Sequence, residues 1–140
     1  MKKLILVPIL LASMTGVVFA ATPFKTVKTE KGVVLSGEKG LTLYTFKKDE
    51  AGASNCYDEC AQNWPSAIAA GNAKANGAYS IVTRKDGTKQ WAKDGKPLYY
   101  WVKDAKQGDV TGDGVGGVGT QRSLDFQQWR GGSSFRAAFV

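Results

Sequence analysis

The residues best suited to chemistry are two cysteines four positions apart, Cys56 and Cys60, which are the only cysteines in the chain. On a helix this spacing places both thiols on one face, near the separation that a disulfide requires. An even cysteine count favours a disulfide in an exported protein. A redox-active pair is the alternative, because a helix N-terminus lowers a thiol pKa, although Asp58 and Glu59 would raise it. The spacing is not Cys-x-x-Cys, so thioredoxin-type and covalent haem sites lack their signature. We therefore expect a structural disulfide.

The chain has no histidine. This excludes Ser-His-Asp and Cys-His nucleophile pairs, histidine metal ligands and the side chain whose ordinary pKa suits acid–base catalysis near neutrality. No cluster of Asp and Glu stands out as a glycosidase-type carboxylate pair. The sequence therefore predicts neither an enzyme nor a cofactor.

A weak calcium candidate lies at Asp109, Thr111 and Asp113, which with Gly114 follow the oxygen spacing of a calcium loop. Thr111 stands where a carboxylate is preferred, and Thr120 stands where the bidentate Glu belongs. We interpret the segment as a tight glycine-rich turn that holds no metal.

A ten-residue motif occurs twice, from Gly40 to Asp49 and from Gly95 to Asp104, in the frame Gly-x-x-Leu-Tyr-x-aromatic-x-x-Asp. Two copies in a chain of 140 residues indicate that one small β unit was used twice. Each aspartate follows its strand by three residues, so Asp49 and Asp104 are expected to accept hydrogen bonds from the backbone of the turn that follows.

The motif aromatics stand two apart within each strand and so share a face of the sheet: Tyr44, Phe46, Tyr99 and Trp101. Bulky residues also occupy the other face. We interpret one face as core and the other as half-covered by the loops around Trp64 and Trp91. The alternative is an exposed platform on which sugars or aromatic ligands stack, with Trp64 and Trp91 facing the ligand.

The predicted elements are mostly strands. Runs at 33–35 and 41–46 predict a hairpin with a longer loop. Runs at 79–83, 88–91 and 97–102 predict a three-stranded meander, because Asp-Gly pairs at 86–87 and 94–95 supply the positive φ that tight turns need. A short helix is expected from Cys56 to Asn63, capped by Ser54-Asn55 and followed by Pro65. Residues 67–77 predict a loop. The fold class is therefore mainly β, a small antiparallel domain of two related hairpin or meander units with one short helix.

The first twenty residues predict a secretory signal, since Lys2 and Lys3 precede an apolar run that ends in small residues at Ala20. The run is shorter than the ~20 apolar residues that span a bilayer. Removing Lys2 and Lys3 lowers the formal charge from +7 to +5. The remaining basic residues form no run typical of a nucleic-acid-binding arm. We expect one domain over 21–118, with units at about 33–66 and 79–118, and a poorly ordered tail over 119–140.

These motifs resemble a family of bacterial secreted repeats, described as predicted lipoproteins with a Tyr-x-(Phe/Trp/Tyr)-x-x-Asp motif. The segments 54–65 and 111–117 are also similar to those that follow the two motif copies in that family. The resemblance covers roughly 33–118 and implies an exported, mostly β domain without an established enzymatic activity. The chain has no lipobox cysteine, so the lipoprotein label is not carried over.

The chain departs from the family pattern after Val118. Members of that family usually continue after the Gly-Gly with Val-Trp-His and a final strand, whereas here Val118 is followed by Gly119 and Thr120. Deleting one nucleotide from codons for Val-Trp-His can give Val-Gly-Thr, so we hypothesise a frameshift near residue 119. Resequencing the locus tests this; an intact frame with Trp-His absent from every alternative frame would contradict it.

Taken together, the sequence predicts a periplasmic or secreted protein, cleaved near Ala20 and not membrane-spanning. The expected role is a non-enzymatic envelope module that binds a ligand or protein partner, not nucleic acid, through its aromatic face and loops. The alternative is a periplasmic redox or metal-handling protein that uses Cys56 and Cys60.

Overall fold

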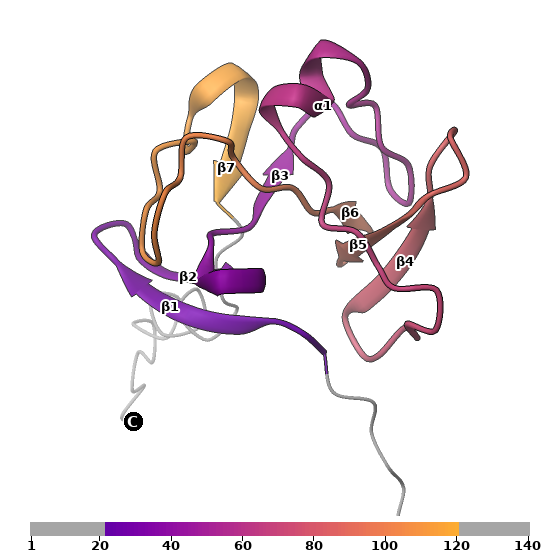
Figure 1. The fold of residues 1–140 in the computed structure, drawn as a ribbon, viewed down its shortest axis with the longest axis horizontal. Helices are drawn as coiled ribbons and strands as arrows, with labels where there is room; N and C mark the ends of the chain where they lie inside the picture. The colour runs from indigo at the N-terminus through magenta and orange to yellow at the C-terminus, as the bar shows by residue number, and fades with distance from the viewer. Residues whose placement is uncertain (1–21, 121–140) are drawn as a thin grey trace, which may run out of the picture.

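The computed structural model describes residues 22–120, so the predicted signal peptide and residues 121–140 lie outside the described part (Figure 1). Its strands form three antiparallel sheets, in the orders β1-β2, β3-β7 and β4-β5-β6. The mainly β prediction is confirmed. The strands are β1 (Lys25–Thr29), β2 (Gly32–Ser36), β3 (Tyr44–Phe46), β4 (Tyr79–Thr83), β5 (Lys89–Lys93), β6 (Lys96–Pro97) and β7 (Val118–Thr120), with helix α1 (Glu59–Asn63) and 3-10 turns at Glu38–Gly40 and Val115–Gly117.

The second unit forms the predicted meander. β4 pairs with β5 over five residues, and β5 pairs with β6. Gly87 has φ 83° and Gly95 has φ 77°, the left-handed values that the Asp-Gly turns predicted. β6 is shorter than the expected run 97–102, because only Lys96–Pro97 pairs continuously with β5.

The first unit differs from the prediction, because β2 pairs along its whole length with β1. The sequence Lys25-Thr-Val-Lys-Thr29 was not predicted as a strand, since only Val27 in it is apolar. The expected contact between 33–35 and 41–46 is present as well: Ser36 bridges Thr42, and the Leu43 N–H donates to the Leu35 carbonyl at 2.9 Å. The first unit is thus a meander like the second.

The two units pair with each other through their motif strands at Tyr44 and Tyr99. The Tyr44 N–H donates to the Tyr99 carbonyl at 2.9 Å, and the Tyr99 N–H donates to the Tyr44 carbonyl at 3.0 Å. The segment after each motif then pairs with the other unit, since β7 pairs with β3, and Ser66 bridges Tyr99. Figure 1 shows the β1–β2 hairpin and the β4–β5–β6 sheet on opposite sides of the molecule, with β3 between them.

Two boundaries need correction. The predicted loop 67–77 begins as an extended segment, because the Ala67 N–H donates to the Leu98 carbonyl at 2.9 Å and the Ala69 N–H donates to the Lys89 carbonyl at 2.8 Å. The domain also runs two residues past its expected end at Val118, since β7 includes Gly119 and Thr120.

The predicted helix over 56–63 is wrong in its first half. Helix α1 begins at Glu59, after Asp58 with φ 52°, so Cys56 precedes the helix. The expected caps are engaged elsewhere: the Ser54 hydroxyl lies 2.7 Å from the Tyr99 hydroxyl, and the Asn55 amide donates to the Lys48 carbonyl at 2.8 Å. Without those caps the helix has only five residues.

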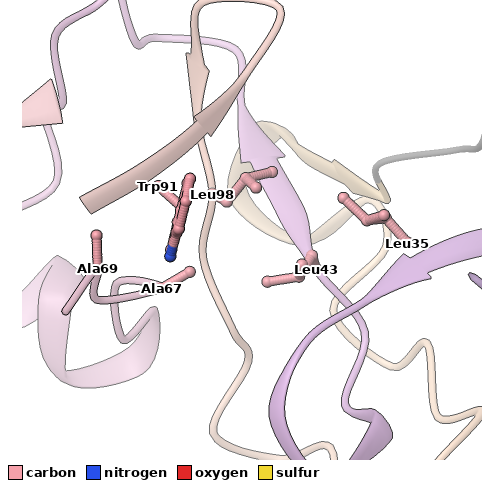
Figure 2. Close-up of a cluster of buried hydrophobic side chains, with 6 residues drawn as sticks. All are labelled: Leu35, Leu43, Ala67, Ala69, Trp91 and Leu98. Atoms are coloured by element: carbon pink, nitrogen blue, oxygen red, sulfur yellow. The ribbon is translucent and has the colours of Figure 1, made fainter. Parts of the chain in front are cut away.

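Buried apolar side chains form two clusters, one on each face of the motif strands. The first contains Leu35, Leu43, Ala67, Ala69, Trp91 and Leu98 (Figure 2). The second contains Tyr44, Cys56, Trp64, Tyr99, Trp101 and Val118. The strand alternation predicted this division, since Leu43 and Leu98 enter one cluster while Tyr44 and Tyr99 enter the other.

The alternative interpretation, in which Trp64 and Trp91 face a ligand, is wrong. Both side chains are buried, at only 7% and 6% exposed. Trp91 packs in the first cluster and Trp64 in the second. A domain of this size gains more from burying such large apolar surfaces than from displaying them. The exposed aromatic platform is therefore not formed by these residues.

Candidate functional site

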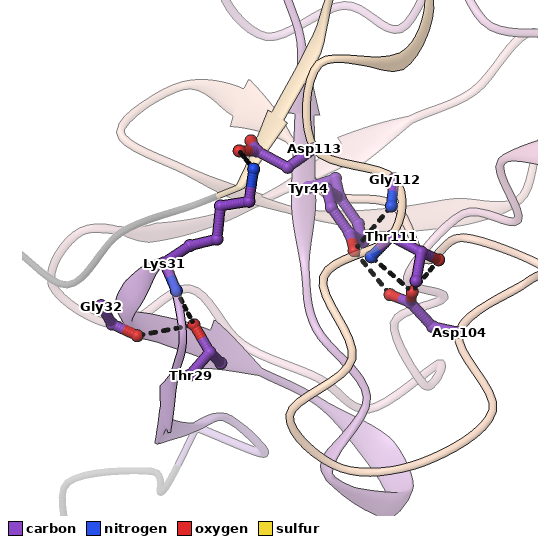
Figure 3. Close-up of polar contacts among 8 residues, drawn as sticks. All are labelled: Thr29, Lys31, Gly32, Tyr44, Asp104, Thr111, Gly112 and Asp113. Carbon is purple, nitrogen blue, oxygen red and sulfur yellow. Dashed lines mark hydrogen bonds and ion pairs between the residues drawn. The ribbon is translucent and has the colours of Figure 1, made fainter.

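The motif tyrosine of the first unit donates a hydrogen bond to the motif aspartate of the second. The Tyr44 hydroxyl donates to Asp104 Oδ2 at 2.6 Å (Figure 3). The other carboxylate oxygen accepts from the Thr111 N–H at 3.1 Å and from its hydroxyl at 2.7 Å. The Gly112 N–H donates to the Tyr44 hydroxyl at 3.3 Å. Asp104 is 6% exposed, so this carboxylate depends on these donors in place of water.

The motif tyrosine of the second unit makes the equivalent bond to the aspartate of the first. The Tyr99 hydroxyl donates to Asp49 Oδ2 at 2.5 Å, and Asp49 Oδ1 accepts from the Asn55 N–H at 2.8 Å. The prediction that each aspartate binds the backbone that follows it is confirmed. The sequence analysis did not predict that each motif tyrosine binds the aspartate of the other unit. The equal Tyr-to-Asp spacing in the two motif copies is the one signal of it in the sequence.

Arg84 is a buried cation that the sequence analysis did not single out. It is 6% exposed, and its Nη1 donates to Ser54 Oγ at 2.9 Å and to Gln90 Oε1 at 2.7 Å. Its Nη2 donates to the Cys56 carbonyl at 2.6 Å. The guanidinium lies 4.4 Å from the centre of the Tyr57 ring, within cation–π range. A lone arginine between a strand and an Asp-Gly turn gives no sequence signal for such burial.

Ser54 joins the arginine to the second crossed pair. Tyr99 uses its single O–H on Asp49, so the Ser54 hydroxyl donates to the Tyr99 oxygen while accepting from Arg84. A continuous polar chain therefore runs from the Asp49 carboxylate to the Arg84 guanidinium.

The electrostatics of the site keep both tyrosines neutral. Burial, and then the hydrogen-bonded carboxylate of Asp104, raise the pKa of Tyr44 far above its ordinary value. Burial and the bond to Asp49 raise the pKa of Tyr99 in the same way. Burial also raises the pKa of Asp49, against the hydrogen bonds from Tyr99 and Asn55 and the charge of Arg84. The two hydroxyls thus stay protonated near neutral pH and act as hydrogen-bond donors to the two carboxylates.

A family model described as a secreted repeat of unknown function matches residues 25–67 and 80–120. These ranges cover both crossed units. The chain belongs to this secreted-repeat family. Neither the curated proteins nor the solved structures gave a match to the chain.

Family membership indicates that this secreted-repeat protein is exported. Over residues 22–120, no helix combines the length and hydropathy that crossing a membrane requires.

The two cysteines of the secreted-repeat protein form a disulfide, with their Cα atoms 5.2 Å apart. Cys56 is 1% exposed and belongs to the second cluster, while Cys60 is half-buried beside it. The bridge ties the start of α1 to the segment whose carbonyl Arg84 binds.

The three calcium candidates of the secreted-repeat protein engage separate partners. Asp109 Oδ2 accepts from the N–H groups of Ala105 and Lys106 at 2.9 and 3.0 Å, which lowers the Asp109 pKa. The Thr111 hydroxyl binds Asp104, and Asp113 pairs with Lys31 at 3.4 Å (Figure 3). Across the described residues, no three His, Cys, Asp or Glu side chains are grouped as a metal site.

A packed stack of two tryptophans leaves no room for a side chain at Gly112. The rings of Trp64 and Trp101 lie 4.1 Å apart, and a Cβ at Gly112 would stand 2.8 Å from Trp64 and 2.9 Å from Trp101. We expect Gly112→Ala to lower the free energy of unfolding by about 1–3 kcal/mol, measured by urea denaturation. Gly71→Ala is the control, because a Cβ there would meet nothing within 4 Å. Equal losses in the two variants would contradict the packing argument.

Two hollows of the secreted-repeat protein lie between β1 and the loop 105–111. One of about 570 Å³ is lined by residues of β1, by Gly37, Lys39 and Gly40 and by Gln107, and the other, of about 400 Å³, continues past Gln107 to Lys106 and Thr111. We call the two together the lysine groove, after Lys25, Lys28, Lys39 and Lys106 in their linings.

Proposed function

We propose that this secreted-repeat protein is a non-enzymatic module that binds a component of the cell envelope in the lysine groove. It acts in the periplasm or outside the cell, after cleavage near Ala20. The observation that carries the proposal is the contrast between two sets of polar groups. The motif side chains that could carry chemistry bind one another, as in Tyr44 with Asp104 and Tyr99 with Asp49. The groove lysines form no ion pair within residues 22–120.

The experiment is co-sedimentation of the mature protein with purified envelope fractions. Thr26→Trp places a large ring in the first hollow and is expected to abolish sedimentation. Thr83→Trp is the matched control, since Thr83 is an exposed strand threonine that does not line the groove. The proposal would be overturned if neither the parent protein nor the control sedimented with the envelope fractions. It would also be overturned if Thr26→Trp sedimented as well as the parent protein.

A redox role for Cys56 and Cys60 is the second candidate. The half-exposed position of Cys60 favours it, because a reductant can reach one sulfur of the bridge. Thiol trapping across a redox buffer series decides between the roles: a potential below about −300 mV indicates a structural bridge, and one near roughly −200 mV supports exchange.

For a structural bridge, we expect the double variant Cys56→Ser/Cys60→Ser to lose about 2 kcal/mol of unfolding free energy, since the closed loop is short. Thermal and urea unfolding of the oxidised parent and the variant measure it. Unchanged stability would show that the bridge does not hold the fold and would favour the redox role.

A further inference from the structure

We propose that the ligand of the lysine groove is an acidic polysaccharide; this inference rests on the proposed function. The first hollow carries Lys25 and Lys39 and has no acidic residue in its lining. The second carries Lys28 and Lys106 beside Glu30 and Asp109. Positive charge is therefore in excess along the groove, and the mature chain is itself cationic.

One of the two acidic residues of the second hollow, Asp109, is hydrogen-bonded within the protein. Asp109 uses one carboxylate oxygen on two backbone N–H groups of its own loop. This bonding stabilises the Asp109 charge where the loop turns. Neither Glu30 nor any of the four groove lysines forms an ion pair within residues 22–120, so four lysines face two carboxylates in the groove.

The groove walls are held in place before any ligand binds. The buried Thr42 hydroxyl donates to the Asp109 carbonyl at 2.6 Å, which fixes the loop 105–111 to the strand region. Gly40 has φ 72° and lies so close to Gln107 that a Cβ there would be 2.7 Å from its Oε1. A preformed groove loses little conformational entropy on binding, so weak charge contacts suffice.

The shape of the groove favours a chain over a small anion. The two hollows adjoin, since Gln107 lines both, with Lys25 and Lys39 in the first and Lys28 and Lys106 in the second. At about 570 and 400 Å³ each hollow is much larger than a single small anion, whereas a polymer with repeated carboxylates can occupy both.

The lining chemistry favours a polysaccharide over other polyanions. No aromatic residue lines either hollow, so the groove offers no surface on which nucleic-acid bases stack. Lysines on an edge strand such as β1 also discourage the addition of a peptide strand. The exposed side chains of Thr26 and Gln107 offer hydrogen bonds to sugar hydroxyls instead.

The test uses polygalacturonate as the acidic probe, with dextran, polyglutamate and oligo-dT as comparisons, in titrations of the mature protein. Lys25→Gln/Lys39→Gln is expected to weaken polygalacturonate binding about fivefold to tenfold. Lys74→Gln/Lys96→Gln removes the same charge at exposed sites outside the groove and is expected to change binding less than about twofold. Binding should also weaken as salt rises.

Three results with the charged probes would overturn the inference: no binding of polygalacturonate at low salt, equal losses in the two double variants, or tighter binding of oligo-dT or polyglutamate through the same lysines. Equally tight binding of dextran would overturn it too, because dextran carries no charge. If polygalacturonate fails to bind while envelope sedimentation remains sensitive to Thr26→Trp, the ligand class is wrong and the proposed function stands.

Discussion

Replacing Arg84 with methionine is expected to lower the free energy of unfolding by about 3 kcal/mol, because hydrogen bonds to a charged donor are worth roughly 1.5–3 kcal/mol and their acceptors stay buried. Gln90 Oε1 and the Cys56 carbonyl lose their Arg84 donor, and Ser54 Oγ keeps only the Cys56 N–H at 3.3 Å. Methionine fills a similar volume, so the loss reports the polar contacts more than a cavity. Urea denaturation gives the free energy, and the melting temperature should fall by on the order of 15 °C.

Lys85→Met is the control for that substitution. Lys85 is the next residue in the chain, also lies over the Tyr57 ring at 5.2 Å, and is exposed. Its replacement removes the same charge and should cost less than about 1 kcal/mol. If Arg84→Met cost no more than Lys85→Met, the polar chain from Asp49 to Arg84 would contribute nothing to stability.

The second large effect is expected at the crossed tyrosines. Tyr44→Phe removes the donor to Asp104 Oδ2 and should cost about 2 kcal/mol, because the carboxylate stays buried after its partner is gone. Tyr99→Phe should cost a similar amount through Asp49, which is half-buried. Chemical denaturation at neutral pH measures both.

Tyr100→Phe is the matched control for these tyrosine variants. The Tyr100 hydroxyl accepts from the exposed backbone N–H of Glu38 at 3.0 Å, and water can replace that bond. Its loss should cost less than about 1 kcal/mol. Equal costs at Tyr44 and Tyr100 would mean that the crossed bond adds nothing beyond an ordinary surface contact.

Local signals in the sequence predicted the second unit well. The Asp-Gly pairs specify left-handed backbone at fixed positions, so the turns and the strands they join followed directly. Strand alternation likewise predicted which motif residues enter each cluster. Both signals act over a few residues and need no knowledge of distant partners.

The missed features have two causes. β1 has only Val27 as an apolar residue, so its strand pattern is weak, and it is a strand because the adjacent β2 pairs with it.

Helix α1 and Arg84 depend on distant partners. The helix starts late because Ser54 is held by Tyr99 and Arg84, which lie 45 and 30 residues away. Burial of Arg84 follows from the same contacts. A competing tertiary hydrogen bond explains both of these differences.

The crossed bonds also restrict how many units a working chain must contain. A lone unit carries one tyrosine and one aspartate whose partners lie in the other unit, as Tyr44 with Asp104 and Tyr99 with Asp49 show. Two identical single-unit copies related by a twofold axis could satisfy both bonds only as a dimer. With both units in one chain the crossed contacts are intramolecular, so the stability that they give does not depend on protein concentration.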